Sequence, residues 1–320
     1  PARAGLPVQP LTSAGTVVAP FRVGHRHVAR LPLVPSAEPA ARKQLLREAD
    51  HAQFLSGRLP VDVPLPEHLG EPFAGYPGWW SVWTWVEGIS LDRAVGVDQG
   101  LLAVDLARLL RTFHELPTGG GSWNNTGRGA RPLADTDWVR SSIERSAHLI
   151  DVVAATTVWE RALAAPPLRG PALTIHGDPV PGNLIIRDGR LAGLVDIAEP
   201  SIGDPAADLV PAWAVFDGDA RDAFRTAMDA DHDAWERGRG WAFEMAIGAL
   251  HYYEHTNPVF FTQALRTLGR LLEPRATAER AQAEERSSTV FIHIGDNYTR
   301  VIPRPGAADT PGSDVRAART

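Results

Sequence analysis

The sequence predicts an α+β fold with two lobes: a small N-terminal lobe with an antiparallel sheet and one main helix, and a larger, mostly helical C-terminal lobe. Three observations support this prediction. Residues 1–87 consist mainly of short apolar runs broken by turn residues. Residues 88–274 carry apolar side chains at helical spacing. The length of 320 residues is enough for two domains or lobes.

The N-terminal lobe is predicted to contain a hairpin, a helix and a buried strand, in that order. Residues 16–23 and 27–31 are two apolar runs on either side of a turn at Gly24. Residues 40–55 have apolar side chains at helical spacing. The aromatic run at residues 76–86 predicts a strand that is buried on both faces, and the lobe boundary follows it. We expect about the first ten residues of the chain to be flexible.

The C-terminal lobe is predicted to be a set of helices followed by an extension. Apolar spacing predicts helices at residues 101–116, 138–165, 222–228, 241–253 and 260–272. Residues 118–137 are rich in glycine and polar residues, which predicts an exposed loop. From residue 275 onward Ala, Glu, Arg, Gly, Pro and Ser dominate, with one apolar island at residues 290–294. We predict a C-terminal extension at residues 275–320 that is partly disordered.

The composition is that of a globular protein, and it excludes several classes of site. Hydrophobic residues make up 44% of the chain and charged residues 22%. The net charge of −6 provides no basic face for nucleic acid and slightly favours a cationic ligand. The absence of cysteine excludes disulfides, thiolate catalysis and Cys-type zinc sites. No apolar run is long enough to span a bilayer and no signal-peptide pattern is visible, so we expect a cytoplasmic enzyme without a membrane partner.

A two-residue hairpin signal lies within the C-terminal lobe. Residues 184–187 and 190–195 are apolar runs separated by Asp188-Gly189, which is typical of a tight turn between antiparallel strands. Folding at this turn brings Asn183, just before the first strand, close to Asp196, just after the second.

Asp178 lies upstream of this hairpin, in a segment that contains Pro179 and Pro181. A strand cannot include that many prolines, so we place Asp178 on a loop. One carboxamide oxygen and two carboxylates would then meet at one end of the hairpin. Hard oxygen ligands of this kind suit Mg²⁺, which completes its shell with water and phosphate oxygens. The sequence therefore predicts a magnesium site at Asn183 and Asp196, beside Asp178.

Five residues of this segment form a recognisable pattern: His176, Gly177 and Asp178, then Asn183 five residues after the aspartate, then Asp196 after the hairpin. The pattern resembles the catalytic loop and metal-binding aspartate of protein kinases. It is more similar still to that of aminoglycoside phosphotransferases, a family of antibiotic and small-molecule kinases that includes macrolide phosphotransferase-like members. The resemblance covers about residues 10–274, and the C-terminal extension lies outside it.

The resemblance implies a two-lobed protein-kinase-like fold and a phosphotransferase that moves the γ-phosphate of ATP or GTP to a small-molecule hydroxyl, with Mg²⁺ as cofactor. Aminoglycosides, macrolides or similar antibiotics would be the acceptors, and the enzyme would be a monomer or weak dimer. Asp178 would be the catalytic residue that accepts or orients the hydroxyl proton, while Asn183 and Asp196 hold the metal. His176 and Asp208 would support the catalytic loop, Asp208 from one turn inside the helix start at Asp204-Pro205.

The resemblance also implies a nucleotide site in the N-terminal lobe. Its residues belong to a covering loop, a phosphate-binding pair and a hinge: Ser13, Gly15 and Thr16; Arg30 and Glu48; Trp85 and Val86. Arg30 stands where kinases usually have a lysine. Lys43, the only lysine among the 32 basic residues, is a poor substitute because it lies near Glu48 on the same predicted helix. The covering loop departs from the pattern, since it has one glycine, and Val18 and Pro20 replace a polar residue and a strand donor.

Candidates for the acceptor pocket are acidic and aromatic residues of the C-terminal lobe: Glu199, Asp204, Trp241, Glu244 and Tyr252. The carboxylates would suit a cationic sugar. Structural interpretations stand beside these functional ones, because Asp204 is also a helix cap and Trp241 a candidate core residue. Arg30 and Glu48 can likewise be ordinary surface charges.

Three other functions fit parts of the pattern. A kinase of a metabolic alcohol or sugar would use the same residues. A pseudokinase would bind nucleotide without transferring phosphate, which the altered covering loop and Arg30 favour. A metal-dependent phosphohydrolase would use His176, Asp178, Asp196 and Asp204, but His176 is the only imidazole near the loop, and dinuclear sites usually need more.

Overall fold

The computed structural model describes residues 5–13, 15–123, 127–197, 201–273, 290–294 and 297–301. The chain divides into two compact units, Pro1–Leu272 and Glu273–Thr320. The second unit contains an antiparallel hairpin of β11 (Val290–Ile294) and β12 (Asn297–Val301). β11 is the apolar island of the sequence, whereas the partial disorder expected for the extension stays a prediction.

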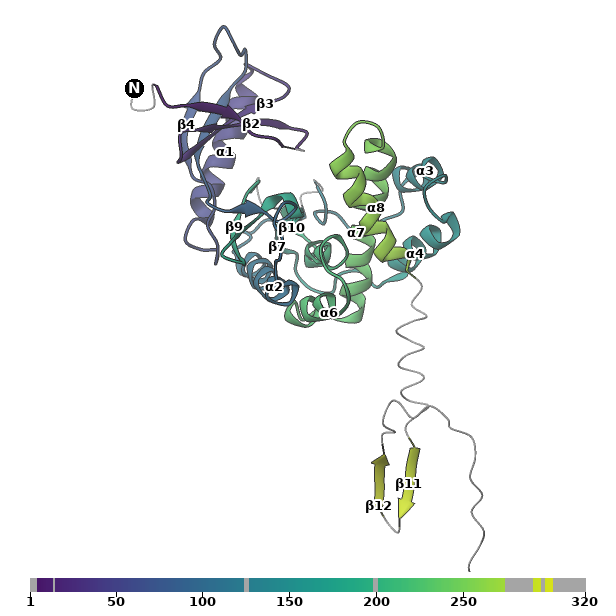
Figure 1. Cartoon of the computed structure of the whole chain (residues 1–320). Coiled ribbons are helices and arrows are strands. Elements are labelled where there is room, and N and C mark those ends of the chain that lie inside the picture. The colour runs from purple at the N-terminus through teal and green to yellow at the C-terminus, as the bar shows by residue number, and fades with distance from the viewer. Residues whose placement is uncertain are drawn as a thin grey trace, which may run out of the picture. The chain divides into compact units, whose positions relative to one another are not determined.

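An antiparallel sheet of five strands forms the N-terminal part of the first unit, in the order β1-β2-β3-β5-β4 (Figure 1). The strands are β1 Val8–Pro10, β2 Val18–Val23, β3 His27–Pro32, β4 Pro66–Gly70 and β5 Trp80–Thr84. β2 and β3 pair on either side of the turn at Gly24, which has a left-handed φ of 58°. In β5 the neighbouring side chains of Val82 and Trp83 are both buried, which confirms the strand expected to be buried on both faces.

One main helix, α1 (Pro39–Leu55), accompanies this sheet and contacts β4 (Figure 1). It begins with a proline in its first turn, where no backbone donor is lost. Its buried residues are His51, Ala52 and Leu55, all in the second half of the helix. The predicted combination of an antiparallel sheet and one helix is therefore confirmed.

The C-terminal part of this unit is mostly helical, as predicted. Its helices are α2 Gln99–Glu115, α3 Asp137–Arg145, α4 Val152–Ala164, α5 Pro211–Ala214, α6 Gly218–Ala227, α7 His232–Tyr253 and α8 Pro258–Leu272. α7 is central, because it packs against α3, α4 and α8. Within the described part of the chain, no helix has the length and apolar character that crossing a bilayer requires.

Two helix predictions needed correction. The predicted helix at 138–165 is two helices, because Asp151 caps a new helix by accepting hydrogen bonds from the backbone N–H groups of Val153 and Ala154. The helix predicted at 241–253 begins nine residues earlier, at His232. Its first half contains Gly238 and Gly240, which weaken the sequence signal. At Gly238 an added Cβ would lie 2.7 Å from Leu209 Cβ, so the glycine permits close packing.

Short strands and turns between the helices carry the candidate site. β6 (Ile89–Ser90), β8 (Leu184–Arg187) and β9 (Arg190–Leu194) form one small sheet, and β7 (Leu173–Ile175) pairs with β10 (Ser201–Gly203) in another. Two 3₁₀ turns, η1 (Pro181–Asn183) and η2 (Pro205–Leu209), follow β7 and β10 respectively.

Candidate active site

The hairpin predicted at Asp188-Gly189 is present. Asp188 and Gly189 have φ values of 53° and 74°, the two left-handed residues that a tight turn of this type requires. At the open end, the Val195 N–H donates to the Asn183 carbonyl at 2.9 Å. Asn183 and the residue before Asp196 are therefore in direct contact, as the sequence predicts.

Asp178 lies on the loop between β7 and η1. Its carbonyl oxygen accepts hydrogen bonds from the Val180 N–H at 2.8 Å and from the Asn183 side-chain amide at 3.2 Å. Since the side-chain nitrogen of Asn183 faces Asp178, the side-chain oxygen of Asn183 is directed away and could coordinate a metal. The Asp178 carboxylate itself is 53% exposed, so it is accessible to a substrate.

Asp208 is fully buried beneath this loop. Its carboxylate accepts hydrogen bonds from the backbone N–H groups of Gly177 at 2.8 Å and His176 at 3.1 Å. The same carboxylate lies 2.9 Å from Nε2 of His114, at the end of α2. A buried carboxylate requires such donors, and here they fix the backbone that leads into Asp178. The sequence did not single out His114.

His176 is half-buried, and its ring contacts the loop. Burial lowers the pKa of its imidazole, with the nearby charge of Asp208 opposing the shift, so the ring is neutral near neutral pH. Its Nδ1 accepts from the Asp178 N–H at 3.1 Å, which assigns the ring proton to Nε2. The ring packs edge-on against Phe113. This neutral imidazole shapes the loop.

Arg30 connects the N-terminal sheet to Asp196. Nη1 of Arg30 lies 3.9 Å from the Glu48 carboxylate on α1, and Nη2 lies 3.5 Å from Oδ1 of Asp196. The pair expected between Arg30 and Glu48 is thus at ion-pair distance. Asp196 has a φ of 58°, an uncommon conformation for a residue other than glycine, and one that often marks a functional position.

Residues of the predicted covering loop and hinge are engaged in contacts within the protein. Oγ of Ser13 accepts from the Gly15 N–H at 3.0 Å, while Ala14 lies outside the described residues. The backbone N–H of Trp85 donates to the Arg26 carbonyl at 2.8 Å and is therefore not available to a purine. The Trp85 ring lies 3.5 Å from the Arg22 guanidinium, a contact that the sequence did not reveal.

Thr16 precedes β2, and Val86 follows β5 with only 7% of its surface exposed. A pocket of 460 Å³ lies at the hinge end of the sheet, but none of the catalytic-loop residues line it; its walls are Arg26, His27, Glu67, Thr84, Trp85 and Glu87. This pocket is therefore distinct from the surroundings of Asp178.

Two of the described acceptor-pocket candidates are buried in the core. Asp204 is 2% exposed, caps η2 and pairs with Arg237 at 2.6 Å, and Trp241 is fully buried. Neither side chain can contact an acceptor in this conformation, because each is enclosed by the helical core. Tyr252 is 63% exposed and packs edge-on against its neighbour Tyr253. Glu199 lies outside the described residues.

Glu244 is the acceptor candidate that lies close to the loop before α3. It forms an ion pair with Arg131, and its other carboxylate oxygen is buried without a hydrogen-bond partner. Burial raises the pKa of the Glu244 carboxyl, and the charges of Arg131 and Arg128 oppose that shift. The same loop supplies Arg128, whose Nη1 donates to Asp178 Oδ1 at 2.6 Å. No sequence signal pointed to Arg128, since it lies in a predicted exposed loop.

The donor set fits a magnesium ion better than a transition metal. Among the described residues, no group of three or more His, Cys, Asp or Glu side chains is placed to hold a metal. Asn183 and Asp196 could provide two oxygen ligands at the open end of the hairpin. Mg²⁺ is usually held by one or two protein ligands together with substrate phosphates and water. A zinc site would require more protein ligands than these.

Comparison with known proteins identifies the family. Residues 21–241 match the phosphotransferase enzyme family. No curated protein sequence matches the chain. Among solved structures, aminoglycoside 2'-phosphotransferase-IIIa in its GDP complex is 16% identical with a TM-score of 0.61, covering 85% of this chain and 94% of its own. The apoenzyme of macrolide 2'-phosphotransferase MphH from Brachybacterium faecium is 20% identical with a TM-score of 0.53, covering 85% and 96%.

A third structure, the ADP-bound aminoglycoside phosphotransferase APH(2'')-Ib, is 17% identical with a TM-score of 0.54, and the match covers 85% of this chain and 94% of that one. At these identities the structures establish a shared, kinase-like fold. The family match spans more than half of the chain and includes the loop of Asp178, the hairpin and η2. The resemblance drawn from the sequence is confirmed, and the chain therefore belongs to the phosphotransferase enzyme family and is a small-molecule phosphotransferase.

Proposed function

We propose that this enzyme transfers the γ-phosphate of ATP or GTP to a hydroxyl group of an aminoglycoside, a macrolide or a similar antibiotic. The observation that carries the proposal is the arrangement of Asp178, Asn183 and Asp196. One turn holds the exposed Asp178 carboxylate and the Asn183 carboxamide together, and the hairpin returns the chain beside them to Asp196. A carboxylate beside two oxygen ligands for Mg²⁺ is what transfer to a hydroxyl requires.

In the proposed reaction, Asp178 accepts a hydrogen bond from the acceptor hydroxyl and takes its proton as the oxygen attacks the γ-phosphorus. The bond between that phosphorus and the bridging oxygen breaks, and the nucleoside diphosphate leaves. Asn183 and Asp196 would hold Mg²⁺, which neutralises charge on the phosphates. Arg30, held by Glu48 on one side, is positioned to contact phosphate oxygens on the other.

The donor and acceptor classes are supported by the solved relatives. Structures of this fold include complexes with ADP and GDP, and one contains both streptomycin and ATP. Another is a macrolide 2'-phosphotransferase. The present chain carries two carboxylates and a carboxamide at its loop and hairpin, so we extend both classes to it as proposals.

A screen of acceptors tests the proposal. Wild-type protein is incubated with Mg²⁺ and ATP or GTP in the presence of aminoglycosides, macrolides, peptide antibiotics or metabolic alcohols, and acceptor-dependent nucleotide consumption is measured. We expect consumption with at least one antibiotic. If nucleotide is consumed only with a metabolic alcohol, that acceptor class would replace the antibiotic assignment. If none of the acceptors causes nucleotide consumption, the proposed function is contradicted.

A matched pair of variants tests the role of Asp178. Asp178→Asn should lower kcat by about 10²- to 10⁴-fold, because the general base is lost while its shape remains. Nucleotide binding, measured by calorimetry, should be retained. Asp188→Asn is the control. Asp188 is an exposed aspartate at the tip of the hairpin between β8 and β9, and asparagine tolerates its left-handed φ. Equal activity of both variants would exclude Asp178 as the base.

A further inference from the structure

Arg128 contacts the backbone and the side chain of the catalytic loop at the same time. Its Nη1 donates one hydrogen bond to the Gly177 carbonyl at 2.8 Å and another to Asp178 Oδ1 at 2.6 Å. The Arg128 side chain is only 22% exposed, so it is held against the protein and does not extend into water. A charge-assisted pair with a second anchor on the backbone restricts a carboxylate far more than a mobile surface pair does.

The backbone beside Arg128 is fixed by close packing. Gly129 has a φ of 78°, and a Cβ there would lie 2.3 Å from Cβ of Ala207 in η2. The Gly129 carbonyl accepts from the Asp204 N–H at 2.9 Å, and a Cβ on Gly203 would lie 1.9 Å from that carbonyl oxygen. No side chain fits between these backbones. Arg128 is therefore anchored to the same turn that carries Asp208.

The neighbouring arginine, Arg131, pairs with a different carboxylate, so Arg128 is the arginine that contacts Asp178. Arg131, three residues further along the loop, already pairs with Glu244 and lies with its guanidinium 5.2 Å from the Trp241 ring. The second oxygen of Asp178, Oδ2, has no ion pair or hydrogen bond among the described residues, and the carboxylate is 53% exposed. One carboxylate oxygen is thus occupied by arginine, while the other has no partner among the described residues.

We propose that Arg128 is a positioning residue that holds the Asp178 carboxylate in the orientation in which Oδ2 receives the acceptor hydroxyl. This inference rests on the proposed function of Asp178. Without Arg128, the Asp178 side chain would rotate freely, and this rotation would have to be restricted each time an acceptor reacts. An anchored guanidinium removes that freedom before the acceptor binds, so its contribution belongs to kcat more than to acceptor binding.

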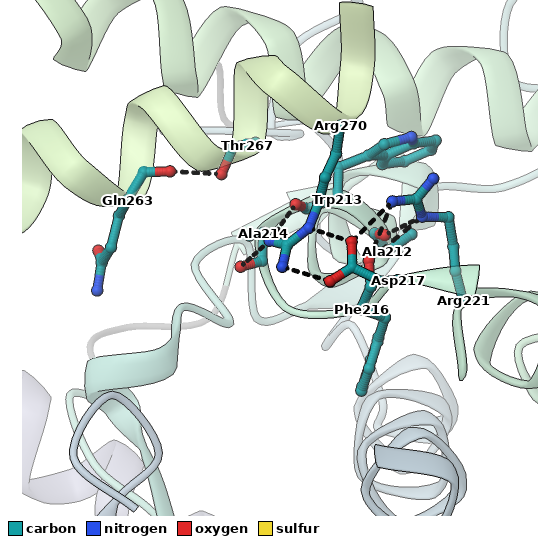
Figure 2. A network of polar contacts seen from close by, with 9 residues as sticks. All are labelled: Ala212, Trp213, Ala214, Phe216, Asp217, Arg221, Gln263, Thr267 and Arg270. Atoms are coloured by element: carbon teal, nitrogen blue, oxygen red, sulfur yellow. Dashed lines mark hydrogen bonds and ion pairs between the residues drawn. The ribbon is translucent and has the colours of Figure 1, made fainter. Parts of the chain in front are cut away.

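The test compares Arg128→Gln and Arg128→Lys with a matched control, Arg270→Gln. Arg270 has the same kind of environment away from the loop: Nη1 donates to the carbonyls of Trp213 and Ala214, and Nη2 donates to Asp217 at 2.7 Å (Figure 2). The exposed fractions are also similar, 19% for Arg270 and 67% for Asp217. The control therefore reproduces the structural cost of losing an anchored arginine–aspartate pair without touching the catalytic loop.

We expect Arg128→Gln to lower kcat by about 10- to 100-fold while KM for nucleotide and acceptor changes by less than about threefold. Arg128→Lys should recover part of the loss, because an ammonium can still donate to Asp178. Arg270→Gln should lower the melting temperature by a similar amount with kcat within about twofold of wild type.

Wild-type kcat in Arg128→Gln would overturn the inference, and so would a kcat loss no larger than that of Arg270→Gln, or a lysine variant no better than the glutamine variant. Activity of the wild type and of Arg270→Gln in the same assay separates this failure from failure of the proposed function. If the wild type consumes no nucleotide with any acceptor, the proposed function falls and this inference falls with it.

Discussion

At the scale of single residues, the loop that carries Asp178 depends on a polar side chain that is buried beneath it. Asp208 has no exposed surface and receives two backbone N–H groups and the His114 imidazole. Removing the charge from one member of such a buried set leaves its partners without an acceptor. The loop that carries Asp178 is therefore sensitive to a residue beneath it.

Asp208→Asn tests this dependence. The carboxamide offers only one oxygen to three donors, so we expect the free energy of unfolding to fall by about 2–4 kcal/mol. Urea denaturation measures the change, and the exposed Asp188→Asn variant is the control. A loss below about 0.5 kcal/mol would mean that the donors find other partners.

His51 makes stability depend on pH. Burial, with a smaller contribution from the nearby His176, lowers the pKa of His51 from 6.5 to about 4. Because the folded state binds a proton less readily than the unfolded state, this stability is complete above pH 6.5 and is lost as the pH falls towards 4. The loss amounts to at most about 3 kcal/mol.

His51→Phe should flatten this dependence, because the ring keeps its bulk and loses its titrating nitrogens. The measurement is the free energy of unfolding between pH 6.5 and pH 4, the two ends of the shift. His25→Phe, at an exposed turn, should leave the wild-type slope unchanged. An unchanged slope in the His51 variant would show that other groups, His176 first among them, account for acid sensitivity.

At the scale of elements, the contact between the loop before α3 and β10 sets the position of Arg128. At Gly203 an added Cβ would lie 1.9 Å from the Gly129 carbonyl oxygen and 2.6 Å from its carbonyl carbon. Both obstacles are backbone atoms, so the strain cannot be relieved by a side-chain rotation. β10 and the loop must separate if residue 203 carries a side chain.

Gly203→Ala should therefore lower the free energy of unfolding by about 2–4 kcal/mol and reduce kcat as well, since Arg128 moves with the loop. Gly269→Ala in α8 is a matched control that should change the free energy of unfolding in the opposite direction. An added Cβ at Gly269 meets nothing within 4 Å, so the substitution should stabilise the helix by about 0.5–1 kcal/mol. Thermal unfolding measures both, and a neutral Gly203 variant would contradict the close approach.

At the scale of the whole molecule, the chain carries a net charge of −6. Two of the carboxylates that the sequence offered for a cationic sugar are compensated by arginines: Asp204 by Arg237, and Glu244 by Arg131. Asp178 is likewise paired with Arg128. Paired carboxylates attract an ammonium much less than free ones, because the arginine charge repels it at nearly the same distance.

The acceptor screen should consequently favour neutral or singly charged acceptors over polycationic aminoglycosides by about 10-fold or more in kcat/KM. Arg131→Gln should lower KM for polycationic acceptors, because it frees the Glu244 carboxylate. Rising ionic strength weakens this discrimination as charges are screened. A clear preference for polycationic acceptors by the wild type would show that the arginine pairs rearrange on binding.

Local signals in the sequence were enough for the family and for much of the fold. Asp188-Gly189 specified the hairpin, prolines specified the loop of Asp178, and the spacing to Asn183 and Asp196 specified the family. These predictions succeeded because each depends on neighbours close in the chain, where backbone geometry is set by residue type. Helix boundaries were less predictable, since Gly238 is tolerated only because α7 packs closely on η2.

The supporting contacts were decided by tertiary structure alone. Arg128 reaches Asp178 across 50 residues of sequence, and His114 reaches Asp208 across 94. No pattern in one sequence marks such partners, because pairing at that distance depends on how helices and loops pack. The burial of Asp204 was hidden for the same reason, whereas Trp241 is the core residue that the sequence also suggested. The sequence by itself determined the family, the hairpin and the loop of Asp178. Packing decided which charges contact that loop and which carboxylates remain accessible, because accessibility belongs to the folded surface.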